Sequence, residues 1–286
     1  MGAKLAWKNR GTVALDAIEV WRAATKTGTL TKVATLAGDA LSYEDTTAPL
    51  NKVSYYSIVS VKGSGRTGTP VTAIGYFTNT GPGPKNLALG DWDFGYFGEV
   101  TDLSQLPNFT ELGTAIGTAA SGAANLTKFY KWIVNGKIIF IPDSTYAQMS
   151  INTLVSAKVM RPVNDTTTPY LTIDKAGYGF TIRLPSFTNV LDNAPITAFD
   201  STLKVSDWGA IAATFTNIST TLPGVLYTYR YNDAAITFIT SGHVLTANYN
   251  TTTTINAMQW SSYQQLLATA LTSNYVVLFI YELNLS

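Results

Sequence analysis

The sequence predicts a mainly β protein, in which an N-terminal β-sandwich precedes a larger β-rich α+β domain. Two observations predict this class, and a third, the low charge, concerns the surface of the protein. Short runs with strand-like alternation recur along the chain, and an Asn-Gly pair at Asn135 and Gly136 joins two of them. Thr, Val, Ile and Tyr, which favour pleated and half-buried surfaces, are frequent. Charged residues are only 13% of the chain, about half the usual share.

The N-terminal segments alternate as strands of a sandwich do. A glycine-rich turn over residues 63–68 would join the last two strands. Leu50 precedes Tyr56 by six residues, which is the spacing of a tyrosine corner. We therefore expect the Tyr56 hydroxyl to pin the loop before its own strand. The predicted strands are residues 5–8, 18–22, 32–36, 43–46 and 50–61.

A run rich in proline and glycine over residues 78–86 predicts the domain boundary. Pro82 and Pro84 fix φ at two positions, so this linker should be short and semi-rigid. The sandwich then occupies residues 1–77. Residues 87–286 form the larger domain.

The first half of the larger domain contains the strongest local signal in the chain. Residues 129–134 and 137–142 read as two strands of a hairpin with a type I′ turn, and Pro142 should end the second strand. Before it, residues 91–98 predict an aromatic strand broken by glycines. Small residues over 113–124 indicate an irregular loop or a poor helix.

Helices and strands alternate in the rest of the chain. Residues 150–158 predict a short helix capped by Ser150 or Asn152. Over residues 256–271 the apolar side chains fall at helical spacing and predict the best helix of the chain. The remaining predicted strands are residues 178–185, 227–239, 243–249 and 275–285.

Few residues offer chemistry. His243 is the only histidine and cysteine is absent, which excludes a zinc site built on these residues and disfavours a Ser-His-Asp triad. A pair of carboxylates could hydrolyse a glycosidic bond, but Asp91 and Asp93 are better explained as solvent-facing positions opposite Trp92 and Phe94. We expect no enzyme activity, metal or cofactor. The candidate acids for the hydrolase alternative are Asp91, Asp93, Glu99, Asp102 and Glu111.

Charge and hydropathy limit the partners. The net charge is +1 with no basic run, so phosphate-driven binding of nucleic acid is not expected. No apolar run is long enough to span a membrane. The N-terminal residues lead directly into a strand, so we expect no signal peptide. Low charge with abundant aromatic residues favours a surface covered by copies of the chain or by other proteins.

Residues 5–73 resemble the fibronectin type III family of Ig-like sandwiches, most closely the versions in tailed-bacteriophage virion proteins. The resemblance covers about a quarter of the chain, and the first strand of the family is absent. The rest resembles, more weakly, a domain of phage tail-fibre, collar and decoration proteins. The pattern is carried by Leu5-Ala6-Trp7, Val20-Trp21-Arg22, Tyr43-Glu44-Asp45-Thr46-Thr47 and Tyr55-Tyr56-Ser57-Ile58-Val59-Ser60-Val61, with Gly65 beyond.

The resemblance implies a structural protein of the tail, collar or head surface, made in the host cytoplasm and released by lysis. Its partners would be copies of itself and other virion proteins. The alternative is a receptor-binding adhesin that recognises a glycan or protein of the host surface. The sandwich's open edge should be covered by a partner chain or by the linker. The candidate interaction surface is Leu5, Trp7, Gly65, Arg66, Trp92 and Phe94.

Overall fold

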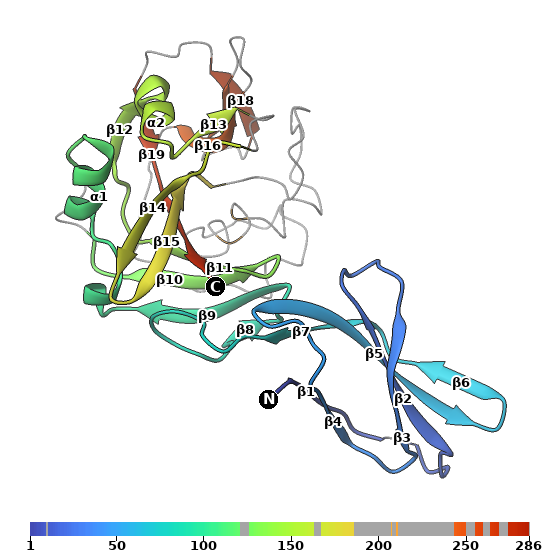
Figure 1. Ribbon diagram of the computed structural model, residues 1–286. Helices are drawn as coiled ribbons and strands as arrows, with labels where there is room; N and C mark the ends of the chain where they lie inside the picture. Colours follow the sequence, from blue (N-terminus) through green and yellow to red (C-terminus); the bar gives the residue numbers. More distant parts are fainter. Residues whose placement is uncertain are drawn as a thin grey trace. The chain divides into compact units, whose positions relative to one another are not determined.

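The structure is a computed structural model, and it describes residues 1–9, 11–120, 126–162, 167–185, 207, 210, 243–249, 255–259, 264–268 and 274–285. The protein is mainly β, with several antiparallel sheets, as predicted (Figure 1). The chain divides into two compact units. Unit 1 contains Met1–Thr80 and Asp91–Asp93, and unit 2 contains Gly81–Gly90 and Phe94–Leu285. The domain bounds predicted from the sequence stay a prediction.

Unit 1 is a sandwich of two sheets. The smaller sheet pairs β1 (Ala3–Ala6) with β4 (Ser42–Asp45). In the larger sheet, β2 (Ala17–Ala23) lies between β3 (Thr31–Ala37) and β5 (Lys52–Lys62). The other edge of β5 pairs with β6 (Gly65–Gly68) at one end and β7 (Thr72–Tyr76) at the other. The predicted strands at 18–22, 32–36, 43–46 and 50–61 are therefore confirmed, and the one predicted at 5–8 starts two residues earlier, as β1. The turn predicted over residues 63–68 is wrong for residues 65–68, which form β6, so only residues 63–64 make the turn.

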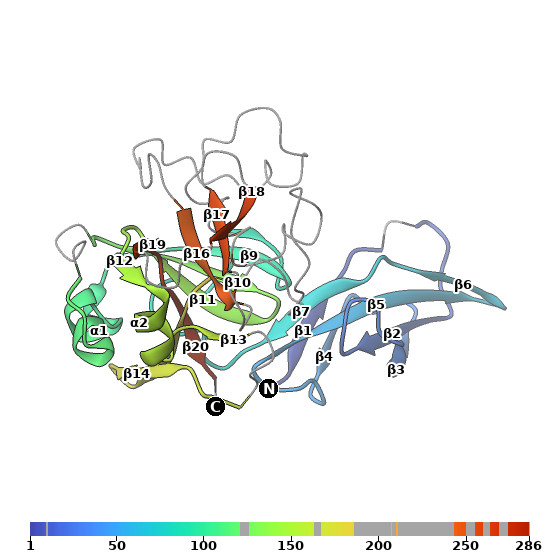
Figure 2. The ribbon, with the colours of Figure 1, turned by 90° about the horizontal axis from the view of Figure 1, so that it is seen from above.

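The core of unit 1 joins the two sheets. Ala3 and Leu5 on β1 pack with Val20 on β2 and Tyr56 on β5, and all four side chains are buried. Residues at alternate positions of β1, β5 and β7 supply this core, because successive side chains of a strand point to opposite faces. The β5–β6 hairpin extends past the other strands of the unit in Figure 2.

The prediction of a tyrosine corner is wrong about the hydrogen-bond partner of the Tyr56 hydroxyl. The Tyr56 hydroxyl donates to Asp45 Oδ2 at 2.9 Å, on the end of β4, and Leu50 is 49% exposed. A carboxylate outcompetes a loop carbonyl here because a charged acceptor makes the stronger hydrogen bond.

A seven-stranded sheet forms the centre of unit 2, in the order β14-β15-β20-β11-β10-β9-β8. The hairpin of β10 (Phe129–Val134) and β11 (Lys137–Pro142) is confirmed, with Asn135 and Gly136 at φ 51° and 75° as a type I′ turn requires. The other strands of this sheet are β8 (Leu89–Gly90), β9 (Phe94–Val100), β14 (Leu171–Lys175), β15 (Tyr178–Arg183) and β20 (Ile280–Asn284).

The second sheet of unit 2 has the order β12-β19-β16-β17-β18, and β13 pairs with β16. The predicted strand at 243–249 is confirmed as β16, whereas residues 227–239 lie outside the described residues. The predicted strand at 275–285 is two strands in different sheets, β19 and β20. The strands are β12 (Ala147–Ser150), β13 (Arg161–Pro162), β16 (His243–Tyr249), β17 (Ile255–Gln259), β18 (Gln264–Ala268) and β19 (Asn274–Val277).

The helix predicted over residues 256–271 is wrong. The described part of this segment forms β17 and β18, which pair with Ile255 opposite Ala268 and Gln259 opposite Gln264. Short apolar runs fit helix and strand periods alike, and pairing with a neighbouring strand overrides the weak helical preference.

Helices are few among the described residues. The predicted helix at 150–158 is confirmed as α2 (Ile151–Ser156), with Ser150 as its N-cap. A one-turn 3₁₀ helix, η1, spans Leu103–Gln105. The helix α1 (Phe109–Ile116) includes the start of residues 113–124, for which an irregular loop or a poor helix was expected, and it begins four residues earlier. Asn108 and Glu111 form a capping box at its N-terminus, a sequence signal that the prediction missed.

Candidate functional site

The six residues of the predicted surface do not gather at one place. Leu5 and Phe94 are buried, each 7% exposed, and belong to different units. Trp7 is half-buried and its Nε1 donates to Ala40 O at 2.9 Å. Gly65 and Arg66 are exposed on β6. Trp92 is half-buried, with its ring stacked on Phe77 at 5.2 Å.

Arg66 belongs to a charged cluster on the outer face of the larger sheet of unit 1. Its Nε lies 3.6 Å from Glu19 Oε2, and Lys32 Nζ lies 3.1 Å from Glu19 Oε1. The Trp21 indole donates to the same carboxylate at 3.2 Å. The hydrogen bond from Lys32 is the main reason that the pKa of Glu19 is lowered. The cluster leaves two partly exposed cations on this face.

The prediction that Asp91 and Asp93 both face solvent is wrong for Asp93. Residues 91–93 precede β9 and pack in unit 1, where Asp93 is 8% exposed. Asp93 accepts from Tyr55 at 2.6 Å and pairs with Lys26 at 3.1 Å. Burial and the Asp93 carboxylate raise the pKa of Tyr55. Trp92 lies flat on Gly75, where a Cβ would come within 2.2 Å of the ring. These contacts anchor the 91–93 segment.

The other candidate acids stabilise local structure. Asp102 caps η1 through Ser104 and Gln105, and these hydrogen bonds lower its pKa. Glu111 closes the capping box of α1 and pairs with Lys175. Glu99 pairs with Lys128 at 2.9 Å. Each carboxylate therefore has a structural partner, and sequence reasoning identified none of these partners.

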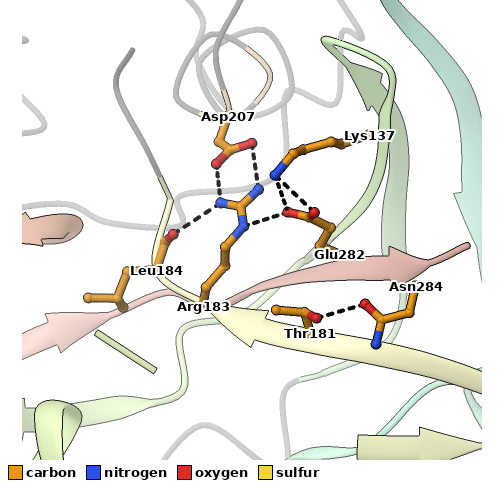
Figure 3. A network of polar contacts seen from close by, with 7 residues as sticks. All are labelled: Lys137, Thr181, Arg183, Leu184, Asp207, Glu282 and Asn284. Carbon is orange, nitrogen blue, oxygen red and sulfur yellow. Dashed lines mark hydrogen bonds and ion pairs between the residues drawn. The ribbon is translucent and has the colours of Figure 1, made fainter. Parts of the chain in front are cut away.

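A buried charge network connects three strands of unit 2 (Figure 3). Arg183 on β15 pairs with Asp207 and, at 2.8 Å, with Glu282 on β20. Lys137 on β11 lies 3.0 Å from the same glutamate. Burial would raise the pKa of Glu282, but Arg183 and Lys137 outweigh burial and lower it. The network holds β15, β20 and β11 in register and fixes Asp207 to them.

Lys131 anchors the linker of unit 2. Its side chain on β10 is fully buried, and Nζ donates to Pro82 O at 3.0 Å and to Pro84 O at 2.7 Å. The ammonium also lies 4.7 Å from the centre of the Phe97 ring, in range of a cation–π contact. Burial, followed by the charge of Lys85, lowers the pKa of Lys131 to about 7.

Lys131 should make stability depend on pH. An unfolded lysine keeps its proton up to about pH 10, whereas folded Lys131 loses it near pH 7. The unfolded state then binds more protons in this window, so the free energy of unfolding should rise by a few kcal/mol from pH 7 to about pH 10. Urea unfolding across this range should show the rise in the wild type and not in Lys131→Met. The exposed Lys52→Met should keep the wild-type slope, and an unchanged slope in Lys131→Met would contradict the assignment.

The buried hydroxyl of Tyr281 in unit 2 has no hydrogen-bond partner among the residues that the structure describes. Tyr281 on β20 is fully buried, its OH is unpaired, and its ring meets Phe129 edge-on at 5.0 Å. Tyr281→Phe should therefore raise the free energy of unfolding by about 1 kcal/mol, because an unpaired polar group is destabilising. Urea unfolding measures this. Tyr146→Phe is the matched control: its OH donates to Thr118 O, so its loss should destabilise. Equal effects of the two variants would refute the explanation.

A hollow lies beside α1 among the residues that the structure describes. It holds about 350 Å³ and is lined by Phe109, Gly113 and the hydroxyl-bearing Thr110, Thr114 and Thr118. Its size suits a small ligand, but none of its lining side chains is charged. In the part of the chain that the structure describes, no group of His, Cys, Asp and Glu side chains could hold a metal ion. No helix among those residues is long and apolar enough to cross a membrane.

Comparison with known proteins found no matching family model, no matching curated protein and no matching solved structure. The function proposed for this chain therefore rests on its sequence pattern and its geometry.

Proposed function

We propose that this protein is a structural subunit of a tailed-bacteriophage virion, an accessory component of the tail, collar or head surface. It acts by packing against copies of itself and against other virion proteins, and it carries no reaction of its own. It is made in the host cytoplasm and leaves the cell by lysis as part of the particle.

The observation that carries the proposal is the sandwich of unit 1. A two-stranded sheet faces a larger sheet in which β3 and β6 each pair with one strand alone among the described residues. Edge strands of this kind present unpaired backbone groups to other chains. The fibronectin type III resemblance of residues 5–73 in sequence also supports the proposal. The low charge of the chain adds support, because interfaces are depleted of charge.

A receptor-binding role is the second candidate, and the β5–β6 hairpin favours it. All residues of β6 are exposed, and Arg66 on it is 58% exposed at its side chain. Arginine in an exposed hairpin can bind a carboxylate of a host glycan or protein. In this reading the hairpin binds the host while the rest of the chain anchors the protein to the particle.

Sedimentation of particles from a lysed culture tests the proposal. The protein should co-sediment with particles through a density gradient and stay bound after washing in high salt. Antibody against the hairpin separates the two candidates: blocking adsorption to host cells supports the receptor-binding role, and unchanged adsorption supports the purely structural one. A protein found only in the soluble fraction would refute both.

A further inference from the structure

β3 is an edge strand with little protection against pairing. It lies at the margin of the larger sheet of unit 1, outside β2, and β2 is its only partner strand among the described residues (Figure 1). Its sequence is Thr-Lys-Val-Ala-Thr-Leu-Ala, with β-branched residues, no proline and one charge. Natural edge strands usually carry several charges, a proline or a bulge that prevents association. The bulge between β2 and β3 lies near Lys32, at one end of β3.

The two faces of β3 define which register a partner strand must adopt. Val33, Ala34 and Leu36 pack against the core of unit 1, whereas Thr35 and Ala37 are exposed. The bulge lies at Val33, so the two faces alternate regularly from Ala34 onward. Opposite residues of an antiparallel pair lie on the same face, so a partner must place core-facing residues opposite Ala34 and Leu36.

A second copy of β3 meets this requirement. An antiparallel pair centred on Thr35 puts Ala34 opposite Leu36 of the second copy and Thr35 opposite Thr35, a favourable cross-strand pair. Lys32 then comes opposite Gly38, next to Asp39 of the other copy, so the two ends have complementary charges. Centring the pair on Ala34 would instead put Leu36 opposite Lys32.

Two other edge strands of unit 1, β1 and β6, pair less well with themselves when each pair is centred on the strand. For β1, the register that puts Ala3 opposite Leu5 of the second copy also puts Lys4 opposite Lys4. For β6, a pair centred on Arg66 opposes two like charges. Like charges directly opposite each other destabilise a strand pair.

We infer that β3 is a homotypic docking edge, at which two copies of this chain join their larger sheets about a two-fold axis centred on Thr35. The inference deepens the proposed function and rests on it. A single strand pair buries less than the roughly 1,200 Å² of a stable interface, so the dimer is weak in solution. In an assembly, neighbouring copies have an effective concentration on the order of millimolar, which is enough to join them.

A charge swap at the centre of the pair tests the inference with the full chain. In a homodimer of Thr35→Lys, or of Thr35→Glu, two like charges lie opposite each other. Each variant should therefore weaken self-association by tenfold or more, on the order of 1.4 kcal/mol. An equimolar mixture of the two variants should recover a dimer. Thr67→Lys on β6 makes the same charge change on an exposed strand of the same sheet and should leave the wild-type dimer intact.

Sedimentation velocity over a range of concentrations measures the monomer–dimer equilibrium of the wild type, of each variant and of the mixture. Circular dichroism confirms that each variant is folded. Three results would overturn the inference: a wild type that stays monomeric, single variants that dimerise as the wild type does, or a mixture that does not dimerise. Self-association that survives both substitutions would place the contact elsewhere and leave the proposed function standing. A protein absent from particles would refute the function whatever its state in solution.

Discussion

Replacing Arg183 by methionine should lower the free energy of unfolding by about 3–5 kcal/mol, because the change leaves two carboxylates buried without their main cation. The Arg183 side chain is 8% exposed, and those of Asp207 and Glu282 are 4% and 18% exposed. Burial would lower the pKa of Arg183, but Asp207 and Glu282 outweigh burial and raise it. Methionine fills similar space, so the lost charge, not a cavity, dominates the effect. Urea unfolding followed by near-ultraviolet circular dichroism measures the change.

Lys137→Met is the matched control for Arg183→Met. It removes a cation from the same glutamate, but the Lys137 side chain is 59% exposed. Exposed pairs contribute little, so the expected loss is below about 1 kcal/mol. Equal losses in the free energy of unfolding for the two variants would contradict this explanation, because burial would then not determine the contribution of Arg183.

Asp45→Asn should lower the free energy of unfolding by about 2–4 kcal/mol, because it removes a buried acceptor of several hydrogen bonds. Asp45 is fully buried; it accepts from Arg22 at 2.7 Å, from Tyr56 at 2.9 Å and from the Thr47 backbone and hydroxyl. Asparagine would replace one accepting oxygen by an NH₂ group, whose two N–H donors would face the donor groups that now bond to Asp45. Urea unfolding at neutral pH measures the loss.

The pH dependence of the Asp45 effect follows from its pKa. Burial would raise this pKa, but the hydrogen bonds from Thr47 and Tyr56 and the charge of Arg22 lower it overall. The stabilisation is therefore complete above the unfolded pKa of about 3.9 and is lost as the pH falls through the lower folded value. The difference between wild type and Asp45→Asn should shrink in that acid range. Glu44→Gln, next in sequence but exposed, should change stability by less than about 0.5 kcal/mol. A constant difference at all pH values would contradict the assignment.

The strands of unit 1 and the β10–β11 hairpin could be predicted because their signals are local. Alternating apolar residues mark β2 and β5 as strands, and Asn135 and Gly136 adopt the positive φ of a type I′ turn. The start of α1 was equally local, since Asn108 and Glu111 form its capping box. The small residues that follow are typical of a loop or a poor helix, so residue composition alone does not indicate α1.

The pairing of distant segments could not be predicted from local patterns. Residues 255–268 have a helical apolar period, yet β17 pairs with β16 and β18, and this pairing determines the structure. The last residues of the chain divide between two sheets at Leu278 and Phe279, which no turn residue marks.

Long-range partners also decide the role of each candidate site residue. Asp93 looked exposed beside Trp92, but Tyr55 and Lys26, distant in sequence, bury and pair it. Leu5 was a candidate surface residue, and it belongs to the core of unit 1. The glycine-rich turn predicts that Arg66 is exposed. Its contact with Glu19 cannot be predicted in the same way, because this contact depends on the register between β5 and β6.

The copy number of the protein in purified particles tests the central claim most directly. Quantitative mass spectrometry of washed virions, with a major virion protein as the standard, gives this number. A subunit that works by packing should be present at a constant whole number of copies that matches the symmetry of its position. Variable trace amounts, together with a soluble pool that cleaves host polysaccharide, would contradict the account.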